Sequence, residues 1–301
     1  MPDAQSGAVA DLGVLMIQGA AAAMETKNSQ AGIDEQNRKF WDELCGTQLA
    51  KQLGVTDSSK ESLEKFDRWY MDFYPYLHRY IPFGELKGRQ VLEVGLGYGT
   101  ISQMLAESGA LYSGLDIAAG PVNMVNHRLH QNGLPGKAVQ GSVLNAPFAD
   151  STFDHVVAIG CLHHTGNLQQ ALDEAWRVLK PGGRAMVMVY YAYSYRRWVY
   201  VPRATMRQFL SDKFGIGTNR LPISDKERAH YDASTKDGGG APETAFTSAS
   251  EMKRLTARWS KCVVHRENIG QEFVFRAMPR AMACRRAGPW VGLDIYCELI
   301  K

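Results

Sequence analysis

Short apolar runs alternate with amphipathic stretches between residues 85 and 191. Apolar runs bounded by turn residues predict buried strands, whereas apolar residues three or four positions apart predict helices with one buried face. The predicted strands are 90–95, 111–116, 137–141, 153–160 and 183–191, and the predicted helices are 100–109, 121–132 and 168–179. Because strands and helices alternate, the pattern predicts an α/β fold with a mostly parallel sheet covered on both faces.

The C-terminal part of the chain returns to this rhythm after an interruption. A helix is predicted over 249–259, and strands are predicted over 261–268 and 293–300. Lys180-Pro-Gly-Gly183 predicts a turn that ends one helix and precedes the next strand. The two parts together are expected to form a single core.

Other segments flank and interrupt this core. Residues 33–84 are helical in pattern and rich in aromatic residues, and prolines end this pattern before the first strand. Residues 192–248 are rich in tyrosine and arginine and follow no regular period, which predicts an inserted cap. The predicted organisation is a flexible N-terminal extension at 1–32, a helical cap at 33–84, a core at 85–191 and 249–301, and a substrate-side cap at 192–248.

Composition narrows the classes of function. The chain has 301 residues, of which 45% are hydrophobic and 22% charged, as in ordinary globular proteins. A net charge of +3 is too small to favour nucleic acid as a partner. The five cysteines form no Cys-x-x-Cys pair, which predicts reduced thiols, a cytoplasmic location and no metal site. No apolar run is long enough to span a membrane, so no membrane partner is expected.

Three glycines follow the first predicted strand at alternate positions, Gly95, Gly97 and Gly99, and a helix is predicted to begin at Thr100. A strand, a glycine turn and a helix form the ligand-binding corner of a doubly wound sheet, where glycine lets the backbone approach the ligand. The spacing G-x-G-x-G differs from the dinucleotide-binding G-x-G-x-x-G. Glu93 precedes the first glycine, and its carboxylate favours a ligand with a cationic end over a pyrophosphate.

A second acid, Asp116, ends the next predicted strand. A carboxylate in this position accepts hydrogen bonds from the two hydroxyl groups of a ribose. S-adenosylmethionine carries an ammonium, a sulfonium and a ribose but no phosphate. It therefore fits these acids and the glycine turn better than NAD does, and the sequence predicts S-adenosylmethionine as the cofactor.

Five motifs in this order resemble those of class I S-adenosylmethionine-dependent methyltransferases, and they are most similar to the bacterial small-molecule methyltransferases with Leu-His-His after the fourth strand. The motifs are Glu93–Gly99, Leu115–Asp116, Gly141–Asp154, Gly160–His164 and Leu179–Gly183. The resemblance implies a Rossmann-like, doubly wound, mostly parallel seven-stranded sheet with an antiparallel terminal strand. It also implies cofactor-binding roles for individual residues.

Glu93 and the three glycines, with Thr100, are expected to hold the methionine end of the cofactor. Asp116 and Ile117 are expected to bind the ribose. The hydroxyl group of a ribose donates to a carboxylate in a charge-assisted hydrogen bond, which is stronger than a neutral one. Asp116 is therefore the residue on which the cofactor assignment mainly depends.

The adenine end is expected to contact Ser142 and Val143, with Gly160 at the end of the fourth strand. The family commonly has an acid where this chain has Ser142, whose neutral hydroxyl group accepts a weaker hydrogen bond.

Trp69 and Tyr70 have two interpretations. Their helical spacing fits core packing, whereas an aromatic face beside a sulfonium is favoured by cation–π attraction. Both are included among the predicted cofactor contacts.

His163 and His164 are the candidate catalytic residues, because a neutral imidazole accepts a proton near pH 7. Adjacent residues on an extended segment point in opposite directions, so one of them is expected to serve, with His164 preferred. The alternative is that a histidine only shapes the loop.

Four arginines of the inserted cap either recognise an anionic substrate or form a solvated face: Arg196, Arg197, Arg203 and Arg207.

These observations predict a methyltransferase that acts on an oxygen, nitrogen or carbon nucleophile of a small molecule. One alternative is a protein that binds S-adenosylmethionine without turnover. Another is a nucleic-acid or protein methyltransferase, which is disfavoured because Gly160-Cys-Leu-His stands where amino-methylating DNA and RNA enzymes have an Asn/Asp-Pro-Pro-aromatic motif. The methyl acceptor and a homodimeric state are left open.

Overall fold

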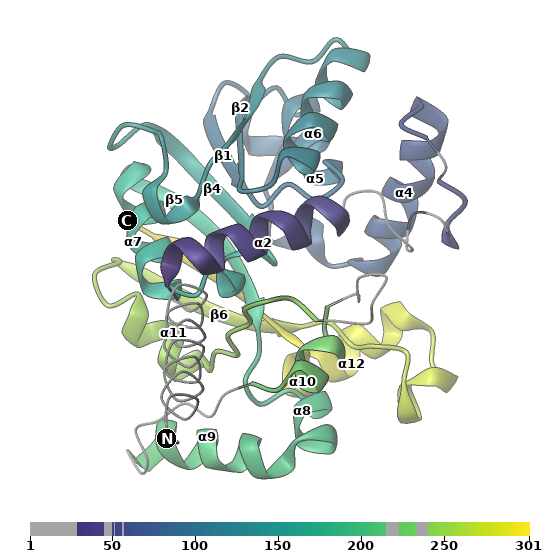
Figure 1. Cartoon of the computed structure of the whole chain (residues 1–301), viewed down its shortest axis with the longest axis vertical. Helices are drawn as coiled ribbons and strands as arrows, with labels where there is room; N and C mark the ends of the chain where they lie inside the picture. Colours follow the sequence, from purple (N-terminus) through teal and green to yellow (C-terminus); the bar gives the residue numbers. More distant parts are fainter. Residues whose placement is uncertain (1–28, 45–49, 51, 56, 215–222, 233–239) are drawn as a thin grey trace, which may run out of the picture.

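The computed structural model describes residues 29–44, 50, 52–55, 57–214, 223–232 and 240–301. In this part of the chain the strands form one seven-stranded sheet in the order β3-β2-β1-β4-β5-β7-β6 (Figure 1). Strands β1 to β5 are parallel, and β7 is antiparallel to both of its neighbours. This confirms the predicted doubly wound, Rossmann-like fold. The strands are β1 Gln90–Val94, β2 Leu111–Asp116, β3 Lys137–Gln140, β4 Phe153–Ile159, β5 Leu179–Tyr190, β6 Lys261–Glu267 and β7 Asp294–Ile300.

Alternate residues of the central strands pack into hydrophobic layers on opposite faces of the sheet. Leu92 and Val156 belong to one buried cluster, and Val91 and Val157 belong to the other. Side chains alternate along a strand, so near-continuous apolar strands are what a sheet covered on both faces requires. One layer contains α5 (Thr100–Glu107), α6 (Ala119–Gln131) and α12 (Arg280–Val291), and the other contains α7 (Leu168–Val178) and α11 (Ala249–Leu255).

The strand order reverses at β1, which has β2 on one side and β4 on the other. Ligands of such sheets bind beyond the carboxyl ends of the strands at this switch point. Helix α2 (Gln30–Leu44) lies across this edge, in purple at the middle of Figure 1. Its Asn37 donates to the carbonyl of His164 at 2.7 Å, and its Asp42 accepts from the backbone N–H of Gly120 at the start of α6.

Helix α4 (Lys60–Phe73) is tied to the helices that flank the glycine turn. Arg128 of α6 is completely buried and donates to Asp67 of α4 from both terminal nitrogens, each at 2.9 Å. Thr100, at the start of α5, donates to the same carboxylate at 2.6 Å. Asp67 therefore holds α4 against both α5 and α6.

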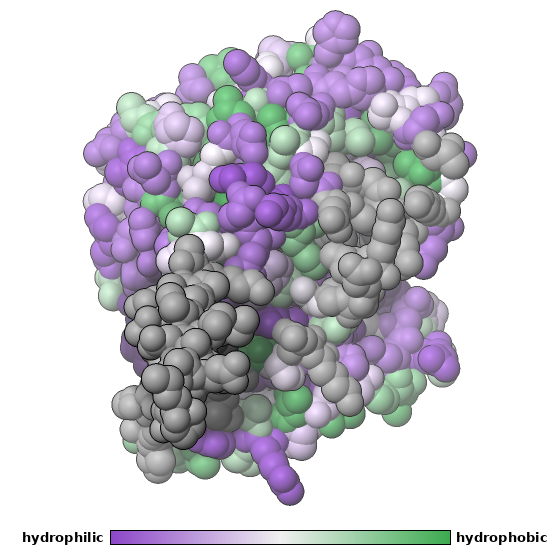
Figure 2. All heavy atoms as spheres, viewed as in Figure 1, coloured by the Kyte–Doolittle hydropathy of each residue, from purple (hydrophilic) through white to green (hydrophobic). Residues whose placement is uncertain are grey.

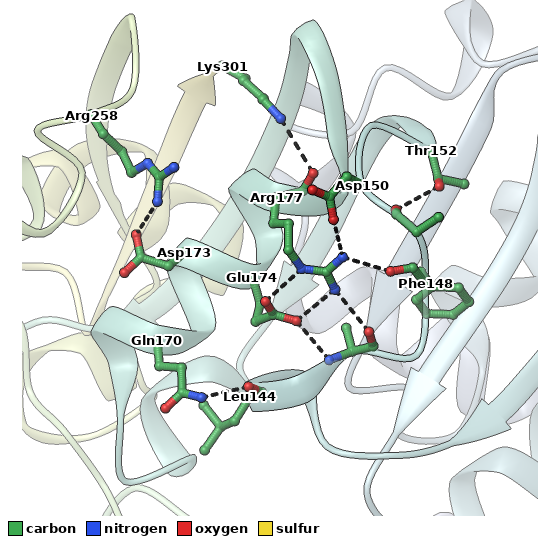
Figure 3. Close-up of polar contacts among 12 residues, drawn as sticks. Leu144, Phe148, Asp150, Thr152, Gln170, Asp173, Glu174, Arg177, Arg258 and Lys301 are labelled. Carbon is green, nitrogen blue, oxygen red and sulfur yellow. Dashed lines mark hydrogen bonds and ion pairs between the residues drawn. The ribbon is translucent and has the colours of Figure 1, made fainter.

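Helix α7 fixes the loop that leads from the 3-10 helix η3 (Val143–Asn145) to β4 (Figure 3). Arg177 donates to the carbonyl of Phe148 at 2.8 Å and forms ion pairs with Glu174 and Asp150, each at 2.7 Å. Glu174 in turn accepts from the backbone N–H of Ala146. These contacts set the position of the segment that follows the predicted adenine-binding residues.

Several predicted boundaries were wrong. Helix α2 begins at Gln30, inside the predicted extension, because the Ser29 hydroxyl accepts from the N–H of Gly32 and caps the helix. Strand β5 begins at Leu179, so Lys180–Gly183 is part of this strand rather than a turn before it. In the pairing of β4 with β5, the register shifts between the pair Phe153↔Leu179 and the pair His155↔Arg184. The extra residues of β5 between these pairs form a bulge.

The remaining corrections concern helices. Helix α11 ends at Leu255, earlier than predicted, and α12 lies in a segment for which no element was predicted. The inserted segment contains α8 (Tyr195–Tyr200), α9 (Pro202–Phe214) and α10 (Asp225–Ala229).

None of the described helices is long and apolar enough to cross a membrane. Four cysteines, at 161, 262, 284 and 297, are free thiols, and Cys45 lies outside the described residues.

Removal of the Arg128 side chain should destabilise the protein, because it leaves a partly buried carboxylate without its partner. We expect Arg128→Ala to lower the free energy of unfolding by about 3 kcal/mol. The matched variant is Arg38→Ala, which breaks the exposed pair with Glu35 and should cost less than about 1 kcal/mol. Urea denaturation of both variants measures the difference, and equal losses would contradict the structural role given to Arg128.

Candidate functional site

A cavity of about 670 Å³ lies at the carboxyl ends of β1, β2, β4 and β5. One part is lined by the glycine turn and Asp116, and another by residues of the inserted segment and of β7. Because β7 runs antiparallel, its first residue, Asp294, reaches the same edge of the sheet. The cavity therefore combines the predicted cofactor residues with residues from distant segments.

The three glycines of the turn meet different requirements, although all have positive φ. A Cβ on Gly95 would lie 2.4 Å from the Cβ of Cys161, and one on Gly99 would lie 3.0 Å from the side chain of Arg128. A Cβ on Gly97 would meet no atom within 4 Å. Gly95 and Gly99 thus allow close packing, whereas Gly97 leaves open space where a ligand can approach the backbone.

Glu93 lines the cavity but is 2% exposed, and its Oε2 accepts from Ser102 Oγ at 2.5 Å and from Tyr112 OH at 2.8 Å. Burial raises the pKa of Glu93 to about 8, and the two hydroxyl donors oppose that rise. A cation bound beside this carboxyl group would favour its charged form. Glu93 therefore fits the ammonium end of the predicted cofactor.

Asp116 ends β2 and lines the cavity. Its Oδ2 accepts from the backbone N–H of Leu96 at 2.8 Å, and its Oδ1 accepts from the N–H of Ala118 at 2.9 Å. Burial raises the pKa of Asp116 to about 6, although these backbone donors lower it. Each carboxylate oxygen can accept more than one hydrogen bond, so Asp116 can still receive the hydroxyl groups of a ribose.

The predicted adenine and ribose neighbours also line the cavity: Ile117, Ser142, Val143 and Gly160. The Ser142 hydroxyl accepts from the backbone N–H of Leu144 at 3.3 Å and caps η3. Thr100 lines the cavity as well, but its hydroxyl already donates to Asp67. Thr100 therefore contributes mainly to the packing of α4 against the turn.

Trp69 and Tyr70 pack as the core interpretation predicts, and their position on the cavity leaves the cofactor contact as a prediction. They pack against Phe66, with ring centroids at 5.6 and 6.3 Å, and both line the cavity. Phe73 and Tyr74 of the same segment line it too, as does Trp41 of α2. Together these rings form an aromatic wall, defined here as Trp41, Trp69, Tyr70, Phe73 and Tyr74.

The two histidines occupy different environments. They lie in the 3-10 helix η4 (Leu162–His164) rather than on an extended segment, and their rings are 4.0 Å apart. His164 lines the cavity, whereas His163 is not among the lining residues. Burial lowers the pKa of His163 well below its usual value, and neither of its ring nitrogens has a hydrogen-bond partner among the described residues.

The ring of His164 is held in one orientation. Its Nδ1 lies 2.6 Å from the carbonyl of Glu243, to which only an N–H can donate. In the neutral ring the lone pair is therefore on Nε2, which lies 3.6 Å from Asp232 Oδ1. Of the two histidines, His164 is the one that lines the cavity, and its Nε2 is buried beside Asp232.

Sequence reasoning missed three polar residues of this site. Tyr190 lies at the end of β5 and donates to Asp232 Oδ1 at 2.7 Å, and both residues line the cavity. Asp294 Oδ2 accepts from Asn268 Nδ2 at 2.7 Å, while its Oδ1 has no partner among the described residues. A carboxylate at the start of a predicted, mostly apolar strand was the available signal for Asp294. We refer to Tyr190, Asp232 and Asp294 as the inner polar group.

Burial raises the pKa of Asp294 to about 7, despite the hydrogen bond from Asn268 and the charges of Arg196 and Arg280, which lower it. The negative charge of Asp232 adds to the rise. Asp294 therefore changes its protonation state near neutral pH. A buried carboxyl group of this kind can accept a proton from a bound molecule.

The predicted arginines are mostly engaged elsewhere. Arg196 lines the cavity but pairs with Glu272 at 2.7 Å, and Arg197 is buried in a pair with Glu227 at 2.8 Å. Arg203 and Arg207 are exposed and do not line the cavity. The described residues also contain no group of three side chains suited to hold a metal ion.

The comparisons with known proteins agree with this geometry. Residues 92–187 match the family model described as a methyltransferase domain. A demethylmenaquinone methyltransferase of Tropheryma whipplei is 34% identical over 35% of this chain and 43% of its own length. A fatty-acid O-methyltransferase of Mycolicibacterium smegmatis is 32% identical over 44% of this chain and 46% of its own. The chain thus spans less than half the length of these curated relatives.

A sterol 4-C-methyltransferase of Caenorhabditis elegans is 28% identical over 62% of this chain and 48% of its own length. Among solved structures, an S-adenosylmethionine-dependent methyltransferase of Mesorhizobium loti matches with a TM-score of 0.50 and 12% identity, over 76% of this chain and 98% of that one. At that identity the likeness concerns the fold alone. Residues 92–187 thus match a methyltransferase domain, within a fold that S-adenosylmethionine-dependent methyltransferases share.

Proposed function

We propose that this protein transfers a methyl group from S-adenosylmethionine to an oxygen, nitrogen or carbon nucleophile of a small molecule. The observation that carries the proposal is that one cavity joins the glycine turn and Asp116 to His164 and the inner polar group. A cofactor and a second molecule can therefore meet in one continuous space. Binding without turnover would not require the second part of this cavity.

The residues around the turn fit the cofactor. Asp116 would accept the ribose hydroxyl groups, Gly97 would leave room for the backbone to approach the ligand, and Glu93 would face the ammonium. Ser142 and Val143 would lie along the adenine edge. When bound, S-adenosylmethionine supplies a methyl group made electrophilic by its sulfonium. The protein then has to orient the acceptor, exclude water and accept a proton where the acceptor releases one.

We assign proton acceptance to His164. Its Nδ1–H is held by the carbonyl of Glu243, which leaves Nε2 free to accept a proton. Asp232, at 3.6 Å from Nε2, would stabilise the imidazolium that forms. His163 would support this residue by packing against it, since its own lowered pKa keeps it neutral.

The acceptor is proposed to have a large apolar part. The aromatic wall would pack against that part, and the inner polar group would receive the polar end. The relatives named for menaquinone, fatty-acid and sterol methylation support this class of acceptor. Of the four arginines considered for an anionic substrate, only Arg196 lines the cavity, and it is already paired with Glu272.

Turnover is tested by incubating the purified protein with S-adenosylmethionine and a panel of quinols, fatty acids, sterols and polar amines, and by measuring release of S-adenosylhomocysteine. Transfer RNA and a protein mixture serve as comparison acceptors. Product formed only with small molecules supports the proposal. Cofactor binding without product from any acceptor favours the alternative of a binding protein, and product from RNA or protein would overturn the substrate class.

Loss of the Asp116 carboxylate should weaken cofactor binding, because the ribose hydroxyl groups lose a charged acceptor. We expect Asp116→Ala to reduce the affinity for S-adenosylmethionine by about 1 to 3 kcal/mol, measured by isothermal titration calorimetry. Asp173→Ala, a change in an exposed side chain of α7, is the control. Unchanged affinity in Asp116→Ala would refute the ribose assignment.

Two glycine variants should separate packing from ligand contact. Gly95→Ala should lower the melting temperature strongly, because its Cβ collides with Cys161. Gly97→Ala places its Cβ in open space, so it should cost only about 1 to 2 kcal/mol of backbone strain while reducing cofactor affinity more than tenfold. Thermal melts and calorimetry measure both effects. A Gly97→Ala protein that binds the cofactor normally would contradict approach of the ligand at this position.

His164→Asn retains a donor for the Glu243 carbonyl but removes Nε2. If His164 accepts the proton, kcat should fall by about 100-fold to 10,000-fold, while cofactor affinity stays within twofold. His130→Asn, an exposed change in α6, is the control. A parallel loss of kcat and cofactor affinity in His164→Asn would make His164 a structural residue.

A further inference from the structure

The segment between β6 and β7 exposes large apolar side chains. In the 3-10 helix η5 (Phe273–Ala277), Phe273 is 48% exposed and Val274 is 75% exposed, and in α12 Trp290 is 76% exposed. Met282 of α12 is exposed as well. Single exposed apolar residues are normal on protein surfaces, but several on one short segment indicate a contact surface.

The same segment is basic. From Phe273 to Leu293 the sequence contains no aspartate or glutamate, and it contains the arginines 276, 280, 285 and 286. Arg280 is turned inward, where it donates to Asn268 and lies over the ring of Phe73. The other three are exposed and, among the residues that the structure describes, form no ion pair. In the lower right of Figure 2, where this part of the chain lies, hydrophobic and hydrophilic residues alternate.

Helix α12 has its small residues on the inside and its large ones outside. Ala283, Cys284 and Gly288 are buried on the side that packs against β6. Met282, Arg286 and Trp290 follow each other at four-residue intervals and so share one outer face. Tryptophan suits the headgroup level of a bilayer, and arginine can extend its charged end toward phosphates, so these side chains on one face fit contact with a lipid surface.

This surface adjoins the rim of the cavity. The ring of Phe273 lies 5.7 Å from Tyr200, which stacks at 4.3 Å on His230, a residue of the cavity lining. Gly270, three residues before Phe273, lines the cavity too. Tyr195 of α8 also packs against Phe275 of η5, with ring centroids 5.1 Å apart. A partner that binds η5 would thus lie beside the cavity.

We propose that η5 and α12 dock the protein on the surface of an anionic lipid bilayer. The apolar side chains would enter the interfacial layer, and Arg276, Arg285 and Arg286 would contact the headgroup phosphates. A second copy of the chain fits less well, because a two-fold contact would bring the arginines of both copies together. This proposal departs from the expectation of no membrane partner, which rested on the absence of a spanning run, because a peripheral contact needs no such run.

The test is co-sedimentation of the full chain with vesicles of phosphatidylcholine alone and with added phosphatidylglycerol. We expect binding to the anionic vesicles that decreases at high salt. Arg285→Gln with Arg286→Gln should lower the partition constant about 30-fold, at roughly fivefold for each arginine. Val274→Ser with Trp290→Ser should lower it further, by about tenfold for each side chain.

Matched controls separate this surface from general charge attraction. Arg89→Gln with Arg184→Gln removes the same charge at the opposite edge of the sheet, and Leu111→Ser removes another exposed apolar side chain. Both should leave vesicle binding within twofold. Wild-type protein that does not sediment with anionic vesicles, or an equal loss in the control variants, would overturn the proposal. So would a dimer that Val274→Ser with Trp290→Ser dissociates, because that result assigns the surface to a second copy.

Discussion

The placement of the cofactor region depends on one buried ion pair. Arg128 is completely buried and reaches Asp67 of α4, while its side chain passes the position where Gly99 lacks a Cβ. A Cβ at Gly99 would press on the stem of the Arg128 side chain, so the glycine leaves room for the side chain that reaches Asp67. Because α4 carries Trp69 and Tyr70, the same pair positions part of the aromatic wall. The pair of Arg128 and Asp67 therefore links the position of the glycine turn to that of the aromatic wall.

The cavity also concentrates buried carboxyl groups. Burial raises the pKa of Glu93 to about 8, of Asp116 to about 6 and of Asp294 to about 7. Each group is held by hydrogen-bond donors that favour its charged form, so its protonation state is balanced near neutral pH. A ligand that brings a cation or hydroxyl donors would further offset the cost of burying these carboxylates in their charged form. Binding and proton release are thus expected to be coupled in this protein.

The second part of the cavity is assembled from segments far apart in the chain. His164 follows β4, Tyr190 ends β5, Asp232 follows α10 and Asp294 begins β7. His164, Tyr190 and Asp294 lie at the carboxyl edge of the sheet because the parallel strands end there and the antiparallel β7 begins there. Asp232 comes from the inserted segment and reaches them through its hydrogen bond from Tyr190. Variation in these connecting segments can alter the acceptor site without altering the cofactor region.

The sequence alone determined the core of the fold, because the alternation of strands and helices and the glycine turn are local patterns. The positions of Glu93, Asp116 and Ser142 at strand ends follow from the same patterns, since the ends of adjacent parallel strands must lie together. Tertiary structure decided the rest. The pairing of Arg128 with Asp67, the facing of His164 toward Asp232, and the unpaired oxygen of Asp294 join residues separated by long stretches of chain. No local period encodes such contacts, because they depend on how helices and inserted segments pack across the sheet.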